Sequence, residues 1–288
     1  MSAKLLDGKI LAAALKESLK KEVEELKKKF GRGPVLASVI AGDDAAASAY
    51  ANSQKKTADY IGIEYKLINL PSDISQKEFL HQIGLLNADK TVSGILILNP
   101  TPPQIDYAAA MNHVGPSKEI EGVNAANIGK MVLTEAKIIP CTPASVMEHI
   151  KSTGVKLRGK EAVVVGRSEI VGKPVSLLLL AQSATVTICH SGTSDAGTLA
   201  DHVRRADIVV AAVGKAGFIK GEWIKEGAIV IDVGINKVND KIVGDVEFET
   251  AQKKAGYITP VPGGVGPLTV VMLMKNCIEA FKEQRRNS

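Results

Sequence analysis

The feature that most constrains the fold of this 288-residue chain is the stretch 161–180, where an apolar run, two glycines and a second apolar run follow one another. Ala162 to Val165 is continuously apolar and rich in β-branched side chains, which is typical of a strand covered on both faces. Gly166 permits a sharp turn, and Pro174 suits the first turn of a helix, where its missing N–H needs no partner. Gly172 removes a side chain at the helix start, where free N–H groups attract an anion. The stretch therefore predicts a cradle for the pyrophosphate of a dinucleotide.

The spacing of this turn, G-x-S-x-x-x-G, differs from the usual G-x-G-x-x-G and would also fit an ordinary strand-to-helix turn. The end of the next strand is more informative. An enzyme that uses NAD usually carries an acid about 20 residues beyond the glycines, where it holds the ribose 2′-OH. Cys189, His190 and Ser191 stand at this strand end, with no acid among them. Arg167 and Ser191 are suited to hold a 2′-phosphate instead, so the pattern favours NADP over NAD.

Composition excludes several classes of protein. With 45% hydrophobic and 23% charged residues, the chain is normal for a soluble globular protein, and no apolar run approaches the ~20 residues of a membrane span. The N-terminus has no signal-peptide core, and three scattered cysteines suggest neither disulfides nor a metal site, so we expect a cytoplasmic protein without a metal. A net charge of +5 and 4% aromatic residues give little reason to expect nucleic-acid binding.

The chain reads as two α/β halves. The first is predicted to begin with an amphipathic helix over 7–29 and to continue as a βαβαβ unit that stops at Asn99–Pro103, the carboxyl end of a strand, where open α/β sheets bind ligands. Its predicted strands are 35–40, 64–70 and 94–98, with helices over 44–61 and 75–86. Residues 105–150 connect the halves, with Pro140–Pro143 as a rigid candidate hinge. The second half is predicted to have strands 162–165, 184–189, 207–212 and 228–232, helices near 174–182 and 196–203, and a closing helix over 268–285.

These segments resemble the methylenetetrahydrofolate dehydrogenase/methenyltetrahydrofolate cyclohydrolase family over essentially the whole chain. The matching segments are Ile139–Pro143, Val163–Pro174, Cys189–Ser191, Lys220–Ile224, Ile231–Asn236, Val243–Val246 and Thr259–Thr269. The resemblance implies two α/β domains, with a folate domain over 1–139 plus 268–288 and a Rossmann-type NADP domain over 140–267. It also implies a folate and NADP in the cleft between them, and a homodimer.

The resemblance implies a set of contact residues. It places Gly166, Arg167, Ser168, Ser191 and Ile235 at the cofactor, with Thr142, Gly214 and Thr269 beside it. The expected contacts with the folate substrate are Tyr50, Leu98, Glu121, Pro262 and Gly263.

The first half departs from the family pattern where its chemistry is expected. The family's Y-x-x-x-K appears as Tyr50 followed by Gln54, so the lysine is missing. The family's Q-L-P-L-P begins here with Leu98 in place of glutamine. The family's D-x-D-G appears as Glu119-Ile120-Glu121-Gly122, so the substrate-holding acid is Glu121 and is one methylene longer.

These departures bear on the two reactions differently. Hydride transfer from 5,10-methylenetetrahydrofolate requires mainly that the substrate is correctly oriented. Tyr50 can provide a flat ring for the folate to pack against, and Glu121 can accept hydrogen bonds from the two donors of the pterin. Hydrolysis of the methenyl product needs a general acid/base, which the family's lysine supplies with the glutamine as a neighbour. Gln54 cannot titrate and Leu98 cannot form a hydrogen bond. The candidate catalytic residues are therefore Tyr50, Gln54 and Glu121.

The sequence thus predicts an NADP-dependent 5,10-methylenetetrahydrofolate dehydrogenase whose methenyltetrahydrofolate cyclohydrolase activity is weak or absent. Three alternatives stay open. The first alternative is a fully bifunctional enzyme with a rearranged acid/base. The second is a catalytically silent homologue that binds NADP or folate, and the third is a Rossmann dehydrogenase for another substrate.

Overall fold

The structure, a computed structural model, describes residues 2–286, which form two compact units. One unit comprises residues 2–12 and 142–269, and the other comprises residues 13–141 and 270–286. The N-terminal segment therefore differs from the prediction that assigned residues 1–139 to one domain, because Lys4–Leu5 (β1) pairs with a strand of the 142–269 unit. Among the described residues, no helix combines the length and hydrophobicity that crossing a membrane requires.

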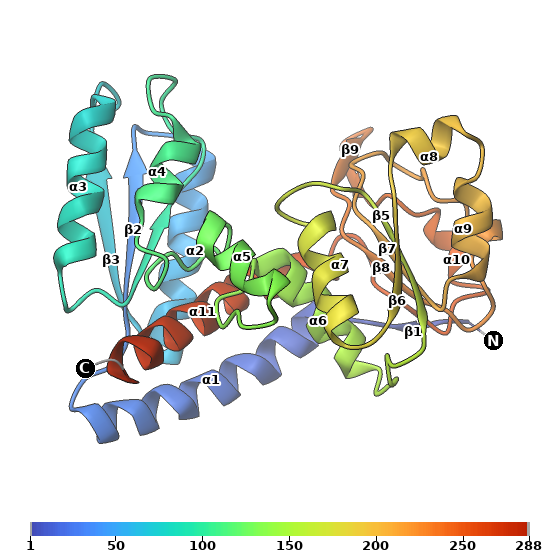
Figure 1. The fold of residues 1–288 in the computed structure, drawn as a ribbon, viewed down its shortest axis with the longest axis horizontal. Helices are drawn as coiled ribbons and strands as arrows, with labels where there is room; N and C mark the ends of the chain where they lie inside the picture. Colours follow the sequence, from blue (N-terminus) through green and yellow to red (C-terminus); the bar gives the residue numbers. More distant parts are fainter. Residues whose placement is uncertain (1, 287–288) are drawn as a thin grey trace. The chain divides into compact units, whose positions relative to one another are not determined.

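The unit of residues 2–12 and 142–269 contains a six-stranded, all-parallel sheet in the order β1-β11-β8-β7-β5-β6 (Figure 1). Its strands are β5 (Glu161–Val165), β6 (Thr185–Cys189), β7 (Ile208–Ala211), β8 (Ile229–Asp232), β11 (Tyr257–Ile258) and β1. The chain runs from β5 outward to β6 and then returns to the other side of β5 with β7. This reversal makes a switch point between β5 and β7, the position where open α/β sheets bind ligands at the carboxyl ends of their strands.

Both faces of this sheet are covered, as the continuous apolar runs predict. One buried cluster contains Val163, Val209 and Val230. The residues that follow them in each strand point to the opposite face and belong to a second buried cluster. The first cluster lies against α9 (Leu199–Arg205), the short helix η1 (Gly221–Trp223) and α10 (Phe248–Ala251), and the second lies against α6 (Cys141–Ser152) and α7 (Gly172–Ala181). The predicted Rossmann-type architecture is confirmed, and β11 and β1 extend it beyond the four strands expected.

The other unit has a parallel three-stranded sheet in the order β3-β2-β4. The strands β2 (Val35–Ala41), β3 (Glu64–Leu70) and β4 (Gly94–Ile97) alternate with α2 (Ala45–Ile61) and α3 (Gln76–Ala88), as predicted. Side-chain caps define the helix starts, since Asp44 accepts from the N–H of Ala47 at 2.7 Å and Ser75 and Glu78 form a reciprocal capping box. The same unit holds α4 (Tyr107–His113), α5 (Ala125–Val132), and most of α1 (Gly8–Phe30) and α11 (Gly266–Arg286).

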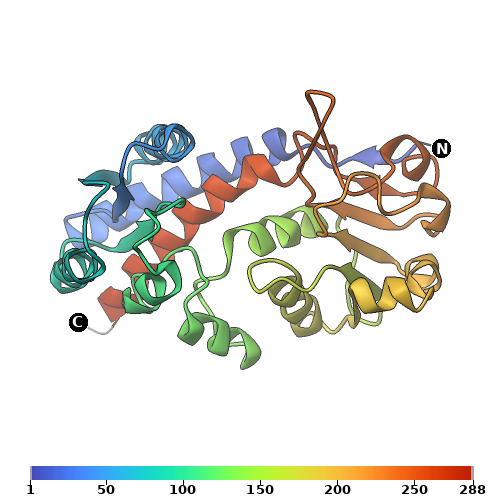
Figure 2. The ribbon, with the colours of Figure 1, turned by 90° about the horizontal axis from the view of Figure 1, so that it is seen from above.

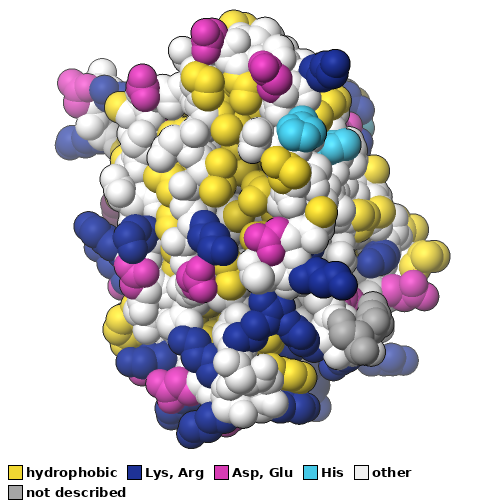
Figure 3. All heavy atoms as spheres, turned by 90° about the vertical axis from the view of Figure 1, so that its left-hand side faces the viewer, with side chains coloured by type: hydrophobic (Ala, Val, Ile, Leu, Met, Phe, Trp, Pro, Cys, Tyr) yellow, Lys and Arg dark blue, Asp and Glu magenta, His cyan; other side chains and the backbone are white. Residues whose placement is uncertain are grey.

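Helices α1 and α11 run side by side in both ribbon views (Figures 1 and 2). The rings of Phe30 and Phe281 meet edge to face with centroids 5.8 Å apart, and Lys282 pairs with Glu22. The predicted amphipathic character of α1 is confirmed, because Leu19 and Val23 are buried whereas Lys27 and Lys28 are exposed. Basic side chains gather on the lower part of the face in Figure 3, with acidic ones among them.

Three parts of the chain differ from the predictions. The connection 105–150 contains α4, α5 and α6, and Cys141–Pro143 forms the first turn of α6, where proline is tolerated. The boundary between the two units does fall at Cys141, inside a helix and not in a loop. The strands β9 (Asn236–Val238) and β10 (Lys241–Val243) form an unpredicted hairpin whose turn residues, Asn239 and Asp240, both have positive φ.

Candidate active site

The glycine turn that follows β5 is built for close backbone packing. A Cβ on Gly166, whose φ is 131°, would lie 2.2 Å from the carbonyl oxygen of Ala212, which follows β7. A Cβ on Gly172 would lie 2.2 Å from the carbonyl oxygen of Gly166. The interpretation of Gly172 as space for a phosphate was therefore wrong, because its missing side chain makes room for the turn's own backbone.

The start of α7 is partly occupied by the turn itself. The Ser168 hydroxyl accepts from the N–H of Val171 at 3.2 Å and from that of Gly172 at 3.4 Å. Arg167 is exposed beside it. Ser191, also exposed, is the first residue of α8 (Ser191–Asp195), which His190 caps by accepting from the N–H of Gly192 at 3.2 Å. Arg167 and Ser191 thus follow the carboxyl ends of the adjacent strands β5 and β6.

Two buried carboxylates organise the loops that follow β7 and β8. Asp245 is fully buried and accepts from the backbone N–H groups of Val213 (2.6 Å), Gly214 (3.0 Å) and Lys215 (2.9 Å). It also accepts from the Asn236 side chain at 2.9 Å. The side chain of Asp245 therefore fixes the backbone of the predicted cofactor contact Gly214 and ties it to the start of the β9–β10 hairpin.

Asp232 has the matching role at the end of β8. It accepts from the N–H groups of Gly234, Asp245 and Val246, each at 2.9 Å. Burial, with the nearby Asp245, raises the pKa of Asp232 to about 6. A Cβ on Gly234 would lie 2.2 Å from the carboxylate of Asp245, so this close packing requires glycine. The Ile231–Asn236 and Val243–Val246 motifs are thus one interlocked structure.

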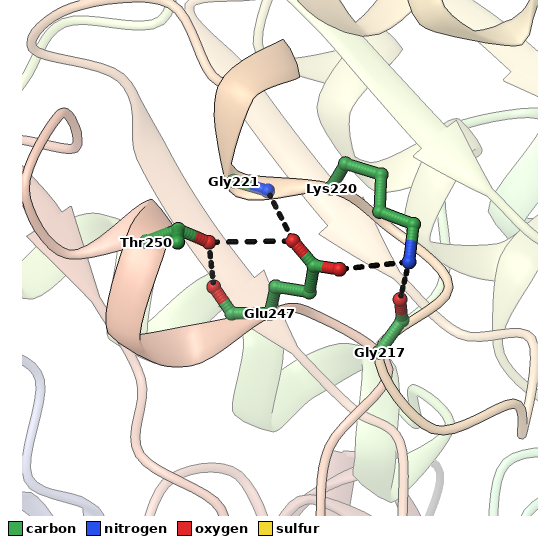
Figure 4. Close-up of polar contacts among 5 residues, drawn as sticks. All are labelled: Gly217, Lys220, Gly221, Glu247 and Thr250. Atoms are coloured by element: carbon green, nitrogen blue, oxygen red, sulfur yellow. Dashed lines mark hydrogen bonds and ion pairs between the residues drawn. The ribbon is translucent and has the colours of Figure 1, made fainter.

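The Lys220–Ile224 motif is also structural (Figure 4). The Lys220 ammonium donates to the Gly217 carbonyl at 3.0 Å and to Glu247 at 2.7 Å. The other oxygen of Glu247 accepts from the N–H of Gly221 and from the Thr250 hydroxyl, both at 3.4 Å. These contacts join η1 to α10 and leave the Lys220 ammonium engaged within the fold.

A hollow of about 390 Å³ lies at the carboxyl end of β8, within the 142–269 unit. Five predicted contact residues line it, namely Thr142, Ile235, Pro262, Gly263 and Thr269. Ile235, which lines this hollow, is 71% exposed. The other predicted cofactor contacts, Gly166, Arg167, Ser168, Ser191 and Gly214, lie outside the lining of this hollow.

The candidate catalytic residues of the other unit form a polar cluster on α2 and the strands beside it. Gln54 is fully buried, and its Oε1 accepts from the hydroxyls of Ser38 (2.9 Å) and Tyr65 (3.1 Å). Tyr50, one turn earlier, is 40% exposed. Its partial burial, with Cys141 and Glu121 nearby, raises the pKa of Tyr50 well above the ordinary value. The position at which the resemblance predicts a lysine therefore holds a buried neutral amide.

Leu98 follows β4 and is 2% exposed. Ser38 pairs in register with Leu96, and side chains two residues apart share a face of the sheet. Leu98 therefore continues the face on which Ser38 meets Gln54, and it contributes only apolar surface there.

Glu121 lies in a tight turn. Its neighbour Glu119 is fully buried and accepts from the N–H groups of Gly122 and Asn124, both at 2.9 Å. The Glu121 carboxylate instead accepts from the Tyr107 hydroxyl at 3.1 Å. Burial, with Glu119 nearby, raises the pKa of Glu121 to about 7.

Sequence reasoning missed three polar partners of the candidate site, Ser38, Tyr65 and Tyr107. Asp106 preceding an alanine-rich stretch is an N-cap signal that would have predicted α4. No pattern links Tyr107 to Glu121, because that contact depends on how α4 packs.

These features define a class of protein. A doubly wound sheet with a glycine turn at its switch point is a nucleotide-binding architecture, and the other unit gathers a tyrosine, an amide and a carboxyl group into one cluster. Together they indicate an enzyme that depends on a dinucleotide.

Comparison with known proteins identifies the family. The chain belongs to the tetrahydrofolate dehydrogenase/cyclohydrolase family, whose catalytic domain matches residues 6–121 and whose NAD(P)-binding domain matches residues 140–285. It is 50% identical over 287 residues to the bifunctional protein FolD of Acetivibrio thermocellus, covering 99% of each chain.

Solved structures of similar proteins cover the same length. The bifunctional FolD of Campylobacter jejuni is 41% identical with a TM-score of 0.92, over 98% of this chain and 99% of that one. The FolD of Trypanosoma brucei, described as complexed with NADP and an inhibitor, is 40% identical with a TM-score of 0.91 over 99% of each chain.

Proposed function

We propose that this enzyme oxidises 5,10-methylenetetrahydrofolate to 5,10-methenyltetrahydrofolate with NADP, and that its cyclohydrolase activity is weak or absent. Membership of the family supports the dehydrogenase reaction. The observation that carries the second part is Gln54, a fully buried amide whose oxygen is engaged by two hydroxyls. It cannot take up or release a proton, so methenyl hydrolysis loses the group that the family pattern provides.

The site residues then have distinct roles. Tyr50 provides a partly exposed ring against which the folate packs, and Glu121 accepts hydrogen bonds from the aminopyrimidine edge of the pterin. Both hold the substrate, and neither needs to move a proton during hydride departure. When bound, NADP supplies the hydride acceptor.

The cofactor residues fit NADP. Arg167 and Ser191 are exposed at adjacent strand ends, no acid stands at the end of β6, and Ile235 and Thr142 line the hollow beside β8. The preference for NADP over NAD rests on Arg167, because its guanidinium can form a bidentate, charge-assisted pair with a 2′-phosphate but only a weaker hydrogen bond with an uncharged ribose hydroxyl.

One assay tests both parts. NADP reduction is followed with 5,10-methylenetetrahydrofolate, and decay of the methenyl absorbance is followed after the cofactor is exhausted. We expect NADP reduction with methenyltetrahydrofolate accumulating to the level of the NADPH formed. Hydrolysis that keeps pace with NADP reduction would contradict the second part, and no reduction at all would contradict the first.

A second candidate function is the full bifunctional activity that the names of the relatives describe. The observation in its favour is Glu121, since a carboxyl group whose pKa is about 7 can act as a general acid/base at neutral pH. Glu121→Gln separates the two candidates, because under this alternative it abolishes a hydrolysis that the unmodified enzyme performs.

We also propose that the protein is a homodimer, formed through the 142–269 unit. Strand β6 is the outer strand of the six-stranded sheet, and it carries Ile188 at 41% exposure, with Leu180 of the preceding helix at 60%. An unpaired strand edge with exposed apolar side chains is a surface on which a second copy would gain buried area.

A further inference from the structure

The backbone that carries Glu121 is held from within its own turn. The Glu119 carboxylate accepts from the N–H of Gly122 at 2.9 Å and from that of Asn124 at 2.9 Å, and the Asn127 amide donates to it at 3.2 Å. Gly122 has a φ of 83°, and a Cβ there would lie 2.5 Å from the nitrogen of Pro140. These contacts restrict the backbone conformation of residues 119–124. The conformational freedom that remains to Glu121 is therefore that of its side-chain torsions.

Tyr107 limits that freedom. Its hydroxyl donates to Oε2 of Glu121 at 3.1 Å, and among residues 2–286 no donor reaches Oε1. Tyr107 is the first residue of α4, whose start is fixed by Asp106 accepting from the N–H of Ala109 at 2.9 Å. The Tyr107 ring packs against the buried cluster that includes Ile97 and Met111. The hydroxyl is thus presented from a rigid position.

We propose that Tyr107 is a positioning residue that orients the Glu121 carboxylate for the folate substrate. This inference rests on the proposed function. A carboxylate has about four acceptor sites, so Tyr107 occupies one on Oε2 and leaves Oε1 and the second site on Oε2 for the two donors of the pterin. Glutamate has one more rotatable bond than aspartate, and Tyr107 offsets the conformational freedom that this bond adds.

The same contact affects the charge of Glu121. The titratable groups that act on Glu121 are Glu119 in its own turn and Tyr107 on α4, while Glu121 in turn acts on Tyr50 of α2 and Cys141 of α6. Burial and Glu119 raise the pKa of Glu121, and the Tyr107 hydrogen bond lowers it. Loss of the hydroxyl therefore raises this pKa further, so that a larger fraction of Glu121 is protonated at neutral pH and cannot accept both donors.

The test compares Tyr107→Phe with Tyr60→Phe. Tyr60 is a matched control because its hydroxyl also donates to a glutamate, Glu17, and its ring is 47% exposed on α2. For Tyr107→Phe we expect the KM for 5,10-methylenetetrahydrofolate at pH 7 to rise about tenfold, the effect of losing one hydrogen bond to a charged group. We expect kcat and the KM for NADP to change less than about twofold, since the group acts on folate binding. Tyr60→Phe should match the unmodified enzyme.

The pH profile and a spectroscopic readout separate positioning from a general structural role. The rise of kcat/KM with pH should shift to higher pH in Tyr107→Phe. The carboxyl carbon of Glu121, assigned in ¹³C NMR by its loss in Glu121→Gln, should titrate at higher pH in Tyr107→Phe than in the unmodified protein. This NMR measurement needs no activity, so it stands even if the proposed reaction is wrong.

A double-mutant cycle completes the test. Glu121→Asp withdraws the carboxylate by one methylene, so Tyr107→Phe should have no further effect on KM in that background. The inference is overturned if Tyr107→Phe leaves both KM and the Glu121 titration unchanged in an active enzyme. It is also overturned if the increase in KM persists in full in the Glu121→Asp background.

Discussion

Replacing Gln54 with lysine tests the reading of the catalytic cluster most directly. In the structure, Gln54 is fully buried and its oxygen accepts from Ser38 at 2.9 Å and Tyr65 at 3.1 Å. A lysine at this position would bring an ammonium between two hydroxyls that can accept from it. Burial lowers the pKa of a lysine, whereas hydrogen bonds to its charged form raise that pKa, and Leu98 on the same face offers no polar group that could position the neutral amine. A single lysine should therefore be a poor general base.

The magnitudes follow from this arrangement. A working general acid/base contributes about 10²–10⁴-fold to a rate, so full restoration of hydrolysis would be a gain of that size. We expect Gln54→Lys alone to gain less than about tenfold, and to lower the free energy of unfolding by about 1–3 kcal/mol because buried hydrogen bonds are lost or rearranged. Adding Leu98→Gln should gain more than the product of the single effects, as expected of residues that act as a unit.

The assay is a double-mutant cycle on both activities, with methenyl decay measured beside NADP reduction. The dehydrogenase rate should change far less than the hydrolysis rate, because hydride departure requires no proton at this position. Full recovery of hydrolysis by Gln54→Lys alone would refute the reasoning, and so would rapid hydrolysis by the unmodified enzyme.

Three further predictions concern the 142–269 unit. Arg167→Ala should weaken NADP binding by ~1.5–3 kcal/mol, the value of a hydrogen bond to a charged group, and leave NAD binding nearly unchanged, as titration with each cofactor would show. Ile188→Lys should convert a dimer into a monomer in sedimentation at micromolar concentration, whereas a monomeric unmodified protein would contradict the proposed interface. Asp245→Ala should lower the free energy of unfolding by about 3 kcal/mol in denaturant titration, because buried N–H groups lose their acceptor, while Asp195→Ala on the exposed surface of α8 should not.

The central strands of the six-stranded sheet were predictable because strands buried on both faces consist of continuous apolar residues. Val163 and Val164 face opposite buried clusters, and only a strand covered on both sides needs such an unbroken apolar run. Strands β1 and β11, of two residues each, are too short to show any period. The hairpin of β9 and β10 lacked a recognised turn, because Asn239 and Asp240 adopt positive φ without a glycine.

The candidate site was predictable only where a residue acts through its own chemistry. Gln54 and Glu121 could be singled out because an amide cannot titrate and a carboxylate can. Their partners Tyr65 and Tyr107 lie 11 and 14 residues away along the chain, on separate elements, so only the packed structure reveals the contacts. Gly172 was misread for a related reason, since sequence shows that a side chain is missing but not which neighbour needs the space.

Side-chain acceptors within the 142–269 unit already engage several backbone N–H groups that follow its strands. Asp245 engages the N–H groups of residues 213–215, Asp232 engages that of Gly234, and Ser168 engages those at the start of α7. We therefore expect exposed cationic side chains such as Arg167 to supply much of the attraction for the phosphates of a dinucleotide. Attraction between exposed charges is screened over about 8 Å at physiological ionic strength. We therefore expect cofactor affinity to fall more steeply with rising salt concentration than it would in a site built from backbone amides.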